Sequence, residues 1–219
     1  MQVFNNNPLE CNTFLYISNN AALIVDAGSP ADEVLIQLKE HNIKRVVLAY
    51  THFHFDHIAY GQSYTAAITK LDIALTTIAN KAEESFFGEA GSQYLTAALQ
   101  NFNLTNYYPA DKPPIINNFL TNNQPLDVDD FILLATPGHS IGSSCYYSKN
   151  HRILFSGDTI FNHGAVGRYD LPTSNIGQLK ASIARLITLP DDTIVYPGHG
   201  SSYRLAEQKA NFEHYLARN

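Results

Sequence analysis

Cysteine is scarce in this sequence, because Cys11 and Cys145 are the only two among 219 residues. Two cysteines exclude a disulfide framework, so a reducing compartment is expected. Long apolar runs are also missing, since no stretch approaches the roughly 20 residues that cross a bilayer. The first residues have neither the basic segment nor the long apolar segment of a secretory signal. The sequence therefore predicts a cytoplasmic protein without a membrane partner, in which both cysteines pack in the interior.

Basic residues are fewer than acidic residues, 14 against 20, and the formal net charge is -6 with histidine neutral. Nucleic-acid binding usually relies on a dense basic surface, so we expect no nucleic-acid partner. Hydrophobic residues make up 45% of the chain, which is enough for a sizeable core. We therefore expect a single domain over residues 1–219, as a monomer or a homodimer.

Short apolar runs alternate with amphipathic segments, and this pattern predicts an α/β (α+β) fold in which two sheets pack together with helices outside. Expected strands cover residues 13–17, 22–26, 45–50, 73–75, 131–135, 143–147, 152–155 and 193–196. Expected helices cover about 30–41, 58–70, 176–189 and 203–215.

A histidine-rich motif, Thr51-His52-Phe53-His54-Phe55-Asp56-His57, directly follows the expected strand 45–50. It brings four potential ligands into six residues at a junction between a strand and a helix. Imidazoles with a carboxylate are the ligands that zinc and related divalent metals prefer. The motif therefore supplies four candidate metal ligands: His52, His54, Asp56 and His57.

Three later motifs repeat one arrangement, an apolar strand followed by turn residues and then a ligand-type side chain. They are Thr136-Pro137-Gly138-His139-Ser140, Leu154-Phe155-Ser156-Gly157-Asp158-Thr159 and Tyr196-Pro197-Gly198-His199-Gly200. Functional sites in layered α/β proteins gather at the carboxyl ends of strands. We therefore expect His139, Asp158 and His199 to meet the first motif at one rim of the fold.

Asp26, at the end of the strand 22–26, is expected to orient a ligand histidine by accepting its other ring N–H. The alternative interpretation is an aspartate that only forms a turn before Ala27-Gly28.

These motifs, in this order, resemble those of the metallo-β-lactamase superfamily. Residues 52–57 match its His-x-His-x-Asp-His signature, and the later His139, Asp158 and His199 match its remaining ligand positions. The resemblance implies a four-layer αββα sandwich with a binuclear metal site at one edge. It assigns one metal ion to His52, His54 and His139. It assigns the second ion to Asp56, His57 and His199, with the Asp158 carboxylate bridging both.

The ligand inventory favours a binuclear metallohydrolase. Two divalent ions about 3.5–4 Å apart can share a water and lower its pKa toward 7. The resemblance then implies that a metal-bridging hydroxide attacks a carbonyl, which makes Asp56 and Asp158 the expected catalytic carboxylates. Zinc is the expected metal, with iron or manganese as alternatives, because His/Asp sites accept all three.

Within the superfamily, the chain looks like the short glyoxalase II-like enzymes, which are hydroxyacylglutathione hydrolases. Residues 156–161 and 164–172 resemble their Gly-Asp-Thr-Leu-Phe and Gly-Arg-Thr-Asp-Leu-Pro segments, with Tyr169 in place of threonine. The resemblance implies hydrolysis of a small-molecule thioester such as S-D-lactoylglutathione, with Arg168 and Tyr169 binding the substrate. A guanidinium suits the carboxylates of such a substrate.

Residues 80–123 are rich in Ala, Asn, Tyr and Phe and have weak periodicity. We interpret them as a helical and loop insertion near the active site. Their aromatic side chains either line the acyl or thiol pocket or pack in the core.

Three alternative functions stay open. An Fe(II) persulfide dioxygenase of the same fold would use His52, His139 and Asp158, although such relatives tend to carry Ala-His-Asp where this chain has Pro-Gly-His-Gly. A metal-dependent lactonase or esterase would use the same hydroxide. A non-catalytic binding module usually lacks some ligands, whereas all seven are present here.

Overall fold

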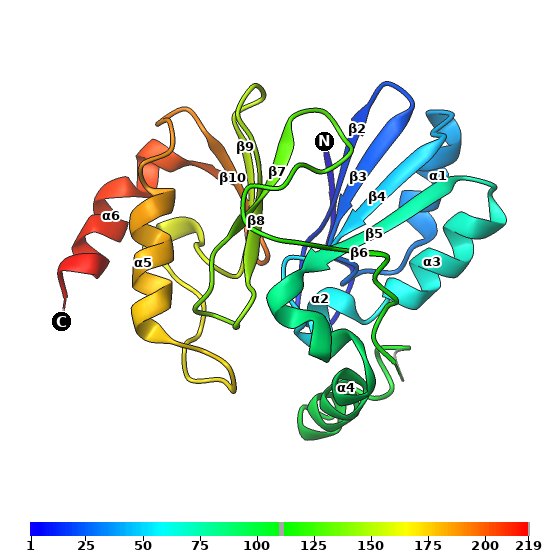
Figure 1. Ribbon diagram of the computed structural model, residues 1–219, viewed down its shortest axis with the longest axis horizontal. Coiled ribbons are helices and arrows are strands. Elements are labelled where there is room, and N and C mark those ends of the chain that lie inside the picture. Colours follow the sequence, from blue (N-terminus) through cyan, green and yellow to red (C-terminus); the bar gives the residue numbers. More distant parts are fainter. Residues whose placement is uncertain (110–111, 219) are drawn as a thin grey trace. The chain divides into compact units, whose positions relative to one another are not determined.

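The computed structural model describes residues 1–109 and 112–218, and these form two compact units, the first covering Met1–Leu120 and the second beginning at Thr121. Each unit is built on one β-sheet that carries its own helices (Figure 1). The single domain expected over 1–219 stays a prediction.

The first unit contains a six-stranded sheet in the order β1-β2-β3-β4-β5-β6. Its strands are β1 (Gln2–Phe4), β2 (Thr13–Ser18), β3 (Ala21–Val25), β4 (Arg45–Ala49), β5 (Ala74–Asn80) and β6 (Asn118–Leu120). Strands β1 to β3 pair antiparallel, and strands β3 to β6 pair parallel. Because β3 and β4 are parallel neighbours, the residues that follow them leave the sheet at the same edge.

Two helices, α1 (Asp32–Glu40) and α3 (Gly61–Lys70), pack against one face of this sheet. Side chains alternate between the two faces of a strand, so every second residue of β3 and β4 points toward these helices. The buried cluster between sheet and helices includes Ala22, Ile24, Val46, Leu48, Val34, Leu38, Tyr64 and Ile68. Each large apolar side chain that is fully buried contributes about 1.5–3 kcal/mol.

The helix expected over 58–70 is divided into α2 (Phe55–Ile58) and α3. The division has a physical cause in the backbone hydrogen bonds of Ala27. The Ala27 N–H donates to His57 O over 2.7 Å, and the Tyr60 N–H donates to Ala27 O over 3.0 Å. These bonds hold α2 against the segment that follows β3 and prevent one continuous helix.

Residues 81–101 form the 3-10 helix η1 (Lys81–Phe87) and the helix α4 (Glu89–Asn101). The sequence predicted helices and loops over residues 80–123, but the structure has strand residues near both ends of this segment. Asn80 still belongs to β5, and Asn118–Leu120 forms β6, which pairs parallel with β5. Residues 110–111 of this segment lie outside the described residues.

The second unit contains a five-stranded sheet in the order β11-β10-β9-β8-β7. Its strands are β7 (Phe131–Ala135), β8 (Ser144–Ser148), β9 (Ile153–Gly157), β10 (Ile194–Pro197) and β11 (Tyr203–Arg204). The pair β9/β10 is parallel and the other pairs are antiparallel.

The helices of the second unit are α5 (Ile176–Leu186), α6 (Leu205–Ala217) and the short 3-10 helix η2 (Asn162–Gly164). Helices α5 and α6 pack on the sheet in one buried cluster that includes Cys145, Leu154, Val195, Leu179, Ile183 and Phe212. Among the helices of the described residues, none has both the length and the apolar character that a membrane span requires.

Candidate metal centre

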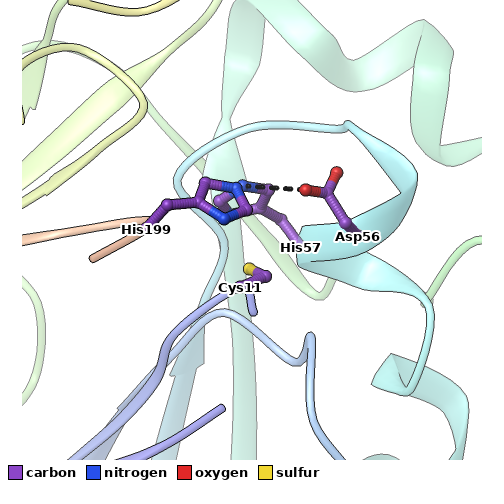
Figure 2. Close-up of side chains that lie close together, drawn as sticks. All are labelled: Cys11, Asp56, His57 and His199. Atoms are coloured by element: carbon purple, nitrogen blue, oxygen red, sulfur yellow. Dashed lines mark ion pairs between the residues drawn. The ribbon is translucent and has the colours of Figure 1, made fainter. Parts of the chain in front are cut away.

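The first unit holds four of the expected ligands, which we call the first donor set: His52, His54, Asp56 and His57. They follow β4, where the chain turns into α2. The His52 ring lies 4.6 Å from the His54 ring and 4.1 Å from the His57 ring, measured between centroids. The Nε2 atom of His57 lies 3.7 Å from Asp56 Oδ2 (Figure 2). The four side chains therefore converge within one unit.

The carboxylate of Asp26 holds this set in place from the end of β3. Its Oδ2 lies 2.8 Å from His57 Nδ1 and also accepts a hydrogen bond from Thr51 Oγ1, over 2.8 Å. Its Oδ1 accepts from the Thr51 N–H, over 2.7 Å. These are the contacts that the orienting role of Asp26 requires, and the role itself stays a prediction.

This network fixes the tautomers of two histidines. A carboxylate only accepts hydrogen bonds, so the Nδ1 of His57 carries a proton toward Asp26. The single hydroxyl proton of Thr51 is donated to Asp26. Thr51 Oγ1 therefore acts as the acceptor in its contact of 3.0 Å with His52 Nδ1, and the imidazole ring donates the hydrogen. In neutral His52 and His57, the Nε2 atoms therefore keep the lone pairs that a metal ligand needs.

Gly28 lets the segment after β3 approach the first donor set closely. A Cβ at this position would lie 2.4 Å from the backbone oxygen of Asp56 and 2.8 Å from Cys11 Sγ. No side chain fits there. Gly28 is therefore required because the segment after β3 packs directly against the histidine-rich motif.

The segment 81–101 places two aromatic side chains, Phe86 and Tyr94, beside the first donor set. The Phe86 ring stacks on Phe53 at 3.9 Å, and the Tyr94 ring lies 6.2 Å from the His54 ring. Burial raises the pKa of Tyr94 to about 12, with a further contribution from the Asp56 and Glu83 carboxylates. Part of the expected insertion thus lies beside the histidine motif within the first unit.

The second unit holds the remaining expected ligands, which we call the second donor set: His139 after β7, Asp158 after β9 and His199 after β10. Asp158 Oδ2 lies 3.6 Å from His139 Nε2 and 3.8 Å from His199 Nε2. Both histidines thus direct Nε2 toward the same carboxylate oxygen. This is the arrangement expected of donors around shared cations.

The turn before His139 depends on Gly138, which has a φ of 139°. A Cβ at Gly138 would lie 2.2 Å from the backbone nitrogen of Leu179 in α5. The Asn175 N–H, just before α5, donates to Gly138 O over 2.8 Å. The start of α5 therefore fixes the position of His139.

Arg168 contributes to the second donor set through its main chain. The Nδ1 atom of His139 donates to the Arg168 carbonyl oxygen over 2.8 Å. The Arg168 guanidinium is exposed and forms hydrogen bonds of 3.0 and 3.1 Å with Asp170. Tyr169 is half exposed. Substrate binding by the side chains of Arg168 and Tyr169 stays a prediction.

Sequence reasoning missed the carbonyl of Arg168 and the hydroxyl of Thr51 as orienting groups. Gly167 was an available signal for the first. A Cβ there would lie 1.9 Å from the backbone oxygen of Asp158 and 3.1 Å from the His139 ring. Only glycine permits this approach, so the Gly167-Arg168 pair positions two expected ligands.

The two cysteines are both buried, but their surroundings differ. Cys145 contacts Thr136, Thr159 and the Ser156 carbonyl, and burial raises its pKa to about 11. Burial also raises the pKa of Cys11, to about 12, against an opposing influence of His57. The structure agrees with a packing role for Cys145, whereas Cys11 lies beside two expected ligands.

Comparison with known proteins gives a family match. The family model of the metallo-β-lactamase superfamily matches residues 6–199. The chain is 33% identical to the probable metallo-hydrolase YqgX of Bacillus subtilis over 208 residues, which covers 93% of this chain and 92% of that protein. It is 29% identical to the hydroxyacylglutathione hydrolase GloC of Haemophilus influenzae, covering 86% of this chain and 84% of GloC.

Solved structures agree with this match. The B3 metallo-β-lactamase BLEG-1 superposes with a TM-score of 0.78 at 28% identity, covering 99% of both chains. The di-iron-bound form of TTHA1623 gives a TM-score of 0.76 at 28% identity, covering 95% of this chain and 96% of that chain. ETHE1 from Myxococcus xanthus gives a TM-score of 0.69 at 21% identity, covering 99% of this chain and 89% of that chain. At this identity the match shows a similar fold and nothing further.

The fold class expected from the sequence, α/β (α+β) of the metallo-β-lactamase type, is confirmed by these likenesses. The family expectation is confirmed by the match over residues 6–199. The chain therefore belongs to the metallo-β-lactamase superfamily, a group of metal-dependent hydrolases and related enzymes that bind divalent metals.

Proposed function

We propose that the protein is a binuclear metal-dependent hydrolase that cleaves thioesters of the S-D-lactoylglutathione type. One observation carries the metal part of this proposal. Each of three expected ligands, His52, His57 and His139, has its Nδ1 atom engaged by an oxygen acceptor of its own unit. Metal-binding histidines show this arrangement, because the acceptor fixes the ring and leaves Nε2 for the metal.

The donor atoms fit zinc or iron. His52, His54 and His139 would hold one ion, Asp56, His57 and His199 would hold a second, and the Asp158 carboxylate would bind both. The assignment follows the order of ligands in the superfamily. When bound, such a pair of ions supplies an activated water and a Lewis acid that polarises a carbonyl.

The chain's own residues have separate tasks in this proposal. Asp26 orients His57 and, through Thr51, also His52. The Arg168 carbonyl orients His139. No cysteine nucleophile is needed, and burial in the second unit's core keeps Cys145 a neutral thiol.

The thioester part is supported by the segments around Asp158 and Arg168. Residues 157–161 read Gly-Asp-Thr-Ile-Phe, and residues 167–172 read Gly-Arg-Tyr-Asp-Leu-Pro, both close to glyoxalase II-like segments. The likeness to GloC points the same way. The exposed Arg168 side chain can exchange its Asp170 partner for a carboxylate of the substrate at little cost, because exposed ion pairs contribute only about 0–1 kcal/mol.

The test measures metal content and turnover on the full chain, purified and then loaded with Zn(II) or Fe(II). We expect two ions per chain and thiol release from S-D-lactoylglutathione. Asp158→Ala is expected to lose metal retention and turnover together. The matched control is Asp72→Asn, because Asp72 is exposed and has a φ of 56°, a conformation that asparagine tolerates.

Three results would overturn the proposal. The first is an Asp158→Ala variant with two ions and full turnover. The second is a metal-loaded protein that hydrolyses lactones or simple esters but no thioester. The third is oxygen uptake with glutathione persulfide under Fe(II) without thioester cleavage, which would identify a persulfide dioxygenase.

A further inference from the structure

Cys11 lies beside two expected metal ligands, Asp56 and His57, although the family's ligand pattern includes no residue at its position. Cys11, Asp56 and His57 each offer one ligand atom, and these three atoms lie within 4.8 Å of one another. All three residues belong to the first unit, and Figure 2 shows the Cys11 sulfur beside His57 and Asp56. Donors at about 2.0–2.3 Å from one zinc ion lie at most about 4.6 Å apart, so this spacing is close to that of ligands of a single ion.

The main chain at Cys11 is held firmly by one side chain. The Asn7 amide accepts from the Cys11 N–H over 3.0 Å and donates to the Cys11 carbonyl over 2.8 Å. The Tyr108 hydroxyl donates to the same Asn7 oxygen, over 3.2 Å. The Cys11 backbone thus has its hydrogen bonds satisfied, and the side chain is set toward the first donor set.

The packing around Gly28 brings the sulfur and the motif together. Cys11 Sγ and the backbone oxygen of Asp56 both occupy the space that a Cβ at Gly28 would need. The contact of Cys11 Sγ with the Asn12 carbonyl is long, at 3.9 Å. Cys145 differs, because its sulfur contacts hydroxyl and carbonyl groups of Thr136, Thr159 and Ser156 and no expected ligand.

We propose that Cys11 supplies a sulfur ligand to the metal ion that Asp56 and His57 hold. This inference rests on the proposed function, since it needs a metal ion at that place. When the ion binds, the Cys11 S–H bond breaks, the proton passes to solvent or buffer, and a bond forms between sulfur and metal. The ion held there then has sulfur, nitrogen and oxygen donors, a set that favours zinc or iron over manganese or magnesium.

The experiment uses the full chain in wild type, Cys11→Ser and Cys145→Ser forms. Each is loaded with Co(II) for an electronic absorption spectrum and with Zn(II) for X-ray absorption spectroscopy. In wild type we expect a sulfur-to-cobalt charge-transfer band and a zinc–sulfur distance of about 2.3 Å beside the shorter zinc–nitrogen and zinc–oxygen distances. Cys11→Ser is expected to lose both signals and to bind its second ion at least about tenfold more weakly.

The matched control is Cys145→Ser, which is expected to keep both signals. The chain has only two cysteines, so a sulfur signal that persists in Cys145→Ser identifies Cys11 even when Cys11→Ser fails to fold. Circular dichroism of the metal-free variants reports their folding.

The outcomes separate this inference from the proposed function. Two bound ions and thioester turnover without any sulfur signal would overturn the role of Cys11 and leave the hydrolase standing. A sulfur signal that is unchanged in Cys11→Ser, or lost in Cys145→Ser, would also overturn it. A chain that retains no metal would refute both proposals.

Discussion

The imidazole of His139 is tied to the main chain of Arg168 by a hydrogen bond of 2.8 Å from Nδ1 to the carbonyl oxygen. A carbonyl only accepts, so Nε2 of the neutral ring keeps its lone pair and lies 3.6 Å from Asp158 Oδ2. The Arg168 side chain points to Asp170 instead. One residue therefore has two separable tasks, one for its backbone and one for its side chain.

Arg168→Ala separates these tasks. The variant keeps the carbonyl, so we expect both metal ions to be retained. KM for an anionic thioester should rise by up to about fivefold, because an exposed ion pair contributes only about 0–1 kcal/mol. Steady-state kinetics with charged and neutral thioesters, together with metal analysis, measure both effects. Arg152→Ala, another arginine with an acidic neighbour, is the control. Loss of metal in Arg168→Ala would contradict the division of tasks.

Gly167→Ala tests the close approach behind the second donor set. The added methyl would lie 1.9 Å from the backbone oxygen of Asp158, so the loop has to move away. We expect reduced metal content, strongly reduced turnover and a lower melting temperature. The control is Gly88→Ala, where the nearest atom to an added Cβ is 3.8 Å away. Equal behaviour of the two variants would show that the loop tolerates a side chain.

Asp26→Asn tests the support of the first donor set. The amide carries no charge and accepts through one oxygen only, whereas the Asp26 carboxylate accepts hydrogen bonds from both Thr51 and His57. Variants that alter such supporting contacts lose about 10- to 100-fold in metal affinity. Competition with a chromophoric chelator measures the affinity, and Asp72→Asn is the control. Unchanged affinity would show that the charge of Asp26 and its second acceptor oxygen contribute nothing to metal binding.

Asp130, which belongs to neither donor set, gives a prediction for stability at low pH. Partial burial acts to raise the pKa of Asp130, but hydrogen bonds from the Ser148 hydroxyl and the Asn150 N–H outweigh it and hold the pKa below its usual value. A lowered pKa in the folded state stabilises the protein above the unfolded value of about 4, and this contribution is lost as the pH falls below it.

The Asp130→Asn variant should therefore be less stable than wild type at neutral pH, and the difference should shrink as the solution is acidified below about pH 4. Thermal melts of the metal-free proteins across this range measure the difference. A constant difference at all pH values would show that the hydrogen bonds, and not the carboxylate charge, carry the effect.

The sequence predicted most strands because buried strands leave strong local patterns, as in Arg45–Ala49 and Phe131–Ala135. It did not predict the short edge strands Gln2–Phe4 and Asn118–Leu120, each of which is defined by pairing with a distant partner. It also joined α2 and α3, because their separation depends on backbone hydrogen bonds to Ala27, far away in sequence. Contacts that are set by tertiary structure leave little local signal.

The sequence could predict the candidate ligands because they follow the same order along the chain as the metal ligands of the superfamily. The groups that orient these ligands could be predicted only where a polar side chain ends a strand, as at Asp26. A main-chain carbonyl such as that of Arg168 has no residue type that reveals it. Cys11 was interpreted as a packing residue because it stands outside every motif, and its position beside His57 emerges only from the folded first unit.

The stacking of Phe86 on Phe53 has a consequence for the way this sequence can diversify. Phe53 stands between two expected ligand histidines in the chain, so the motif and the segment 81–101 share one aromatic contact. Exchange of that segment for the corresponding part of a relative would bring a new neighbour to residue 53. Changes at positions 53 and 86 are thus expected to occur in pairs among relatives, because each ring fills space beside the other.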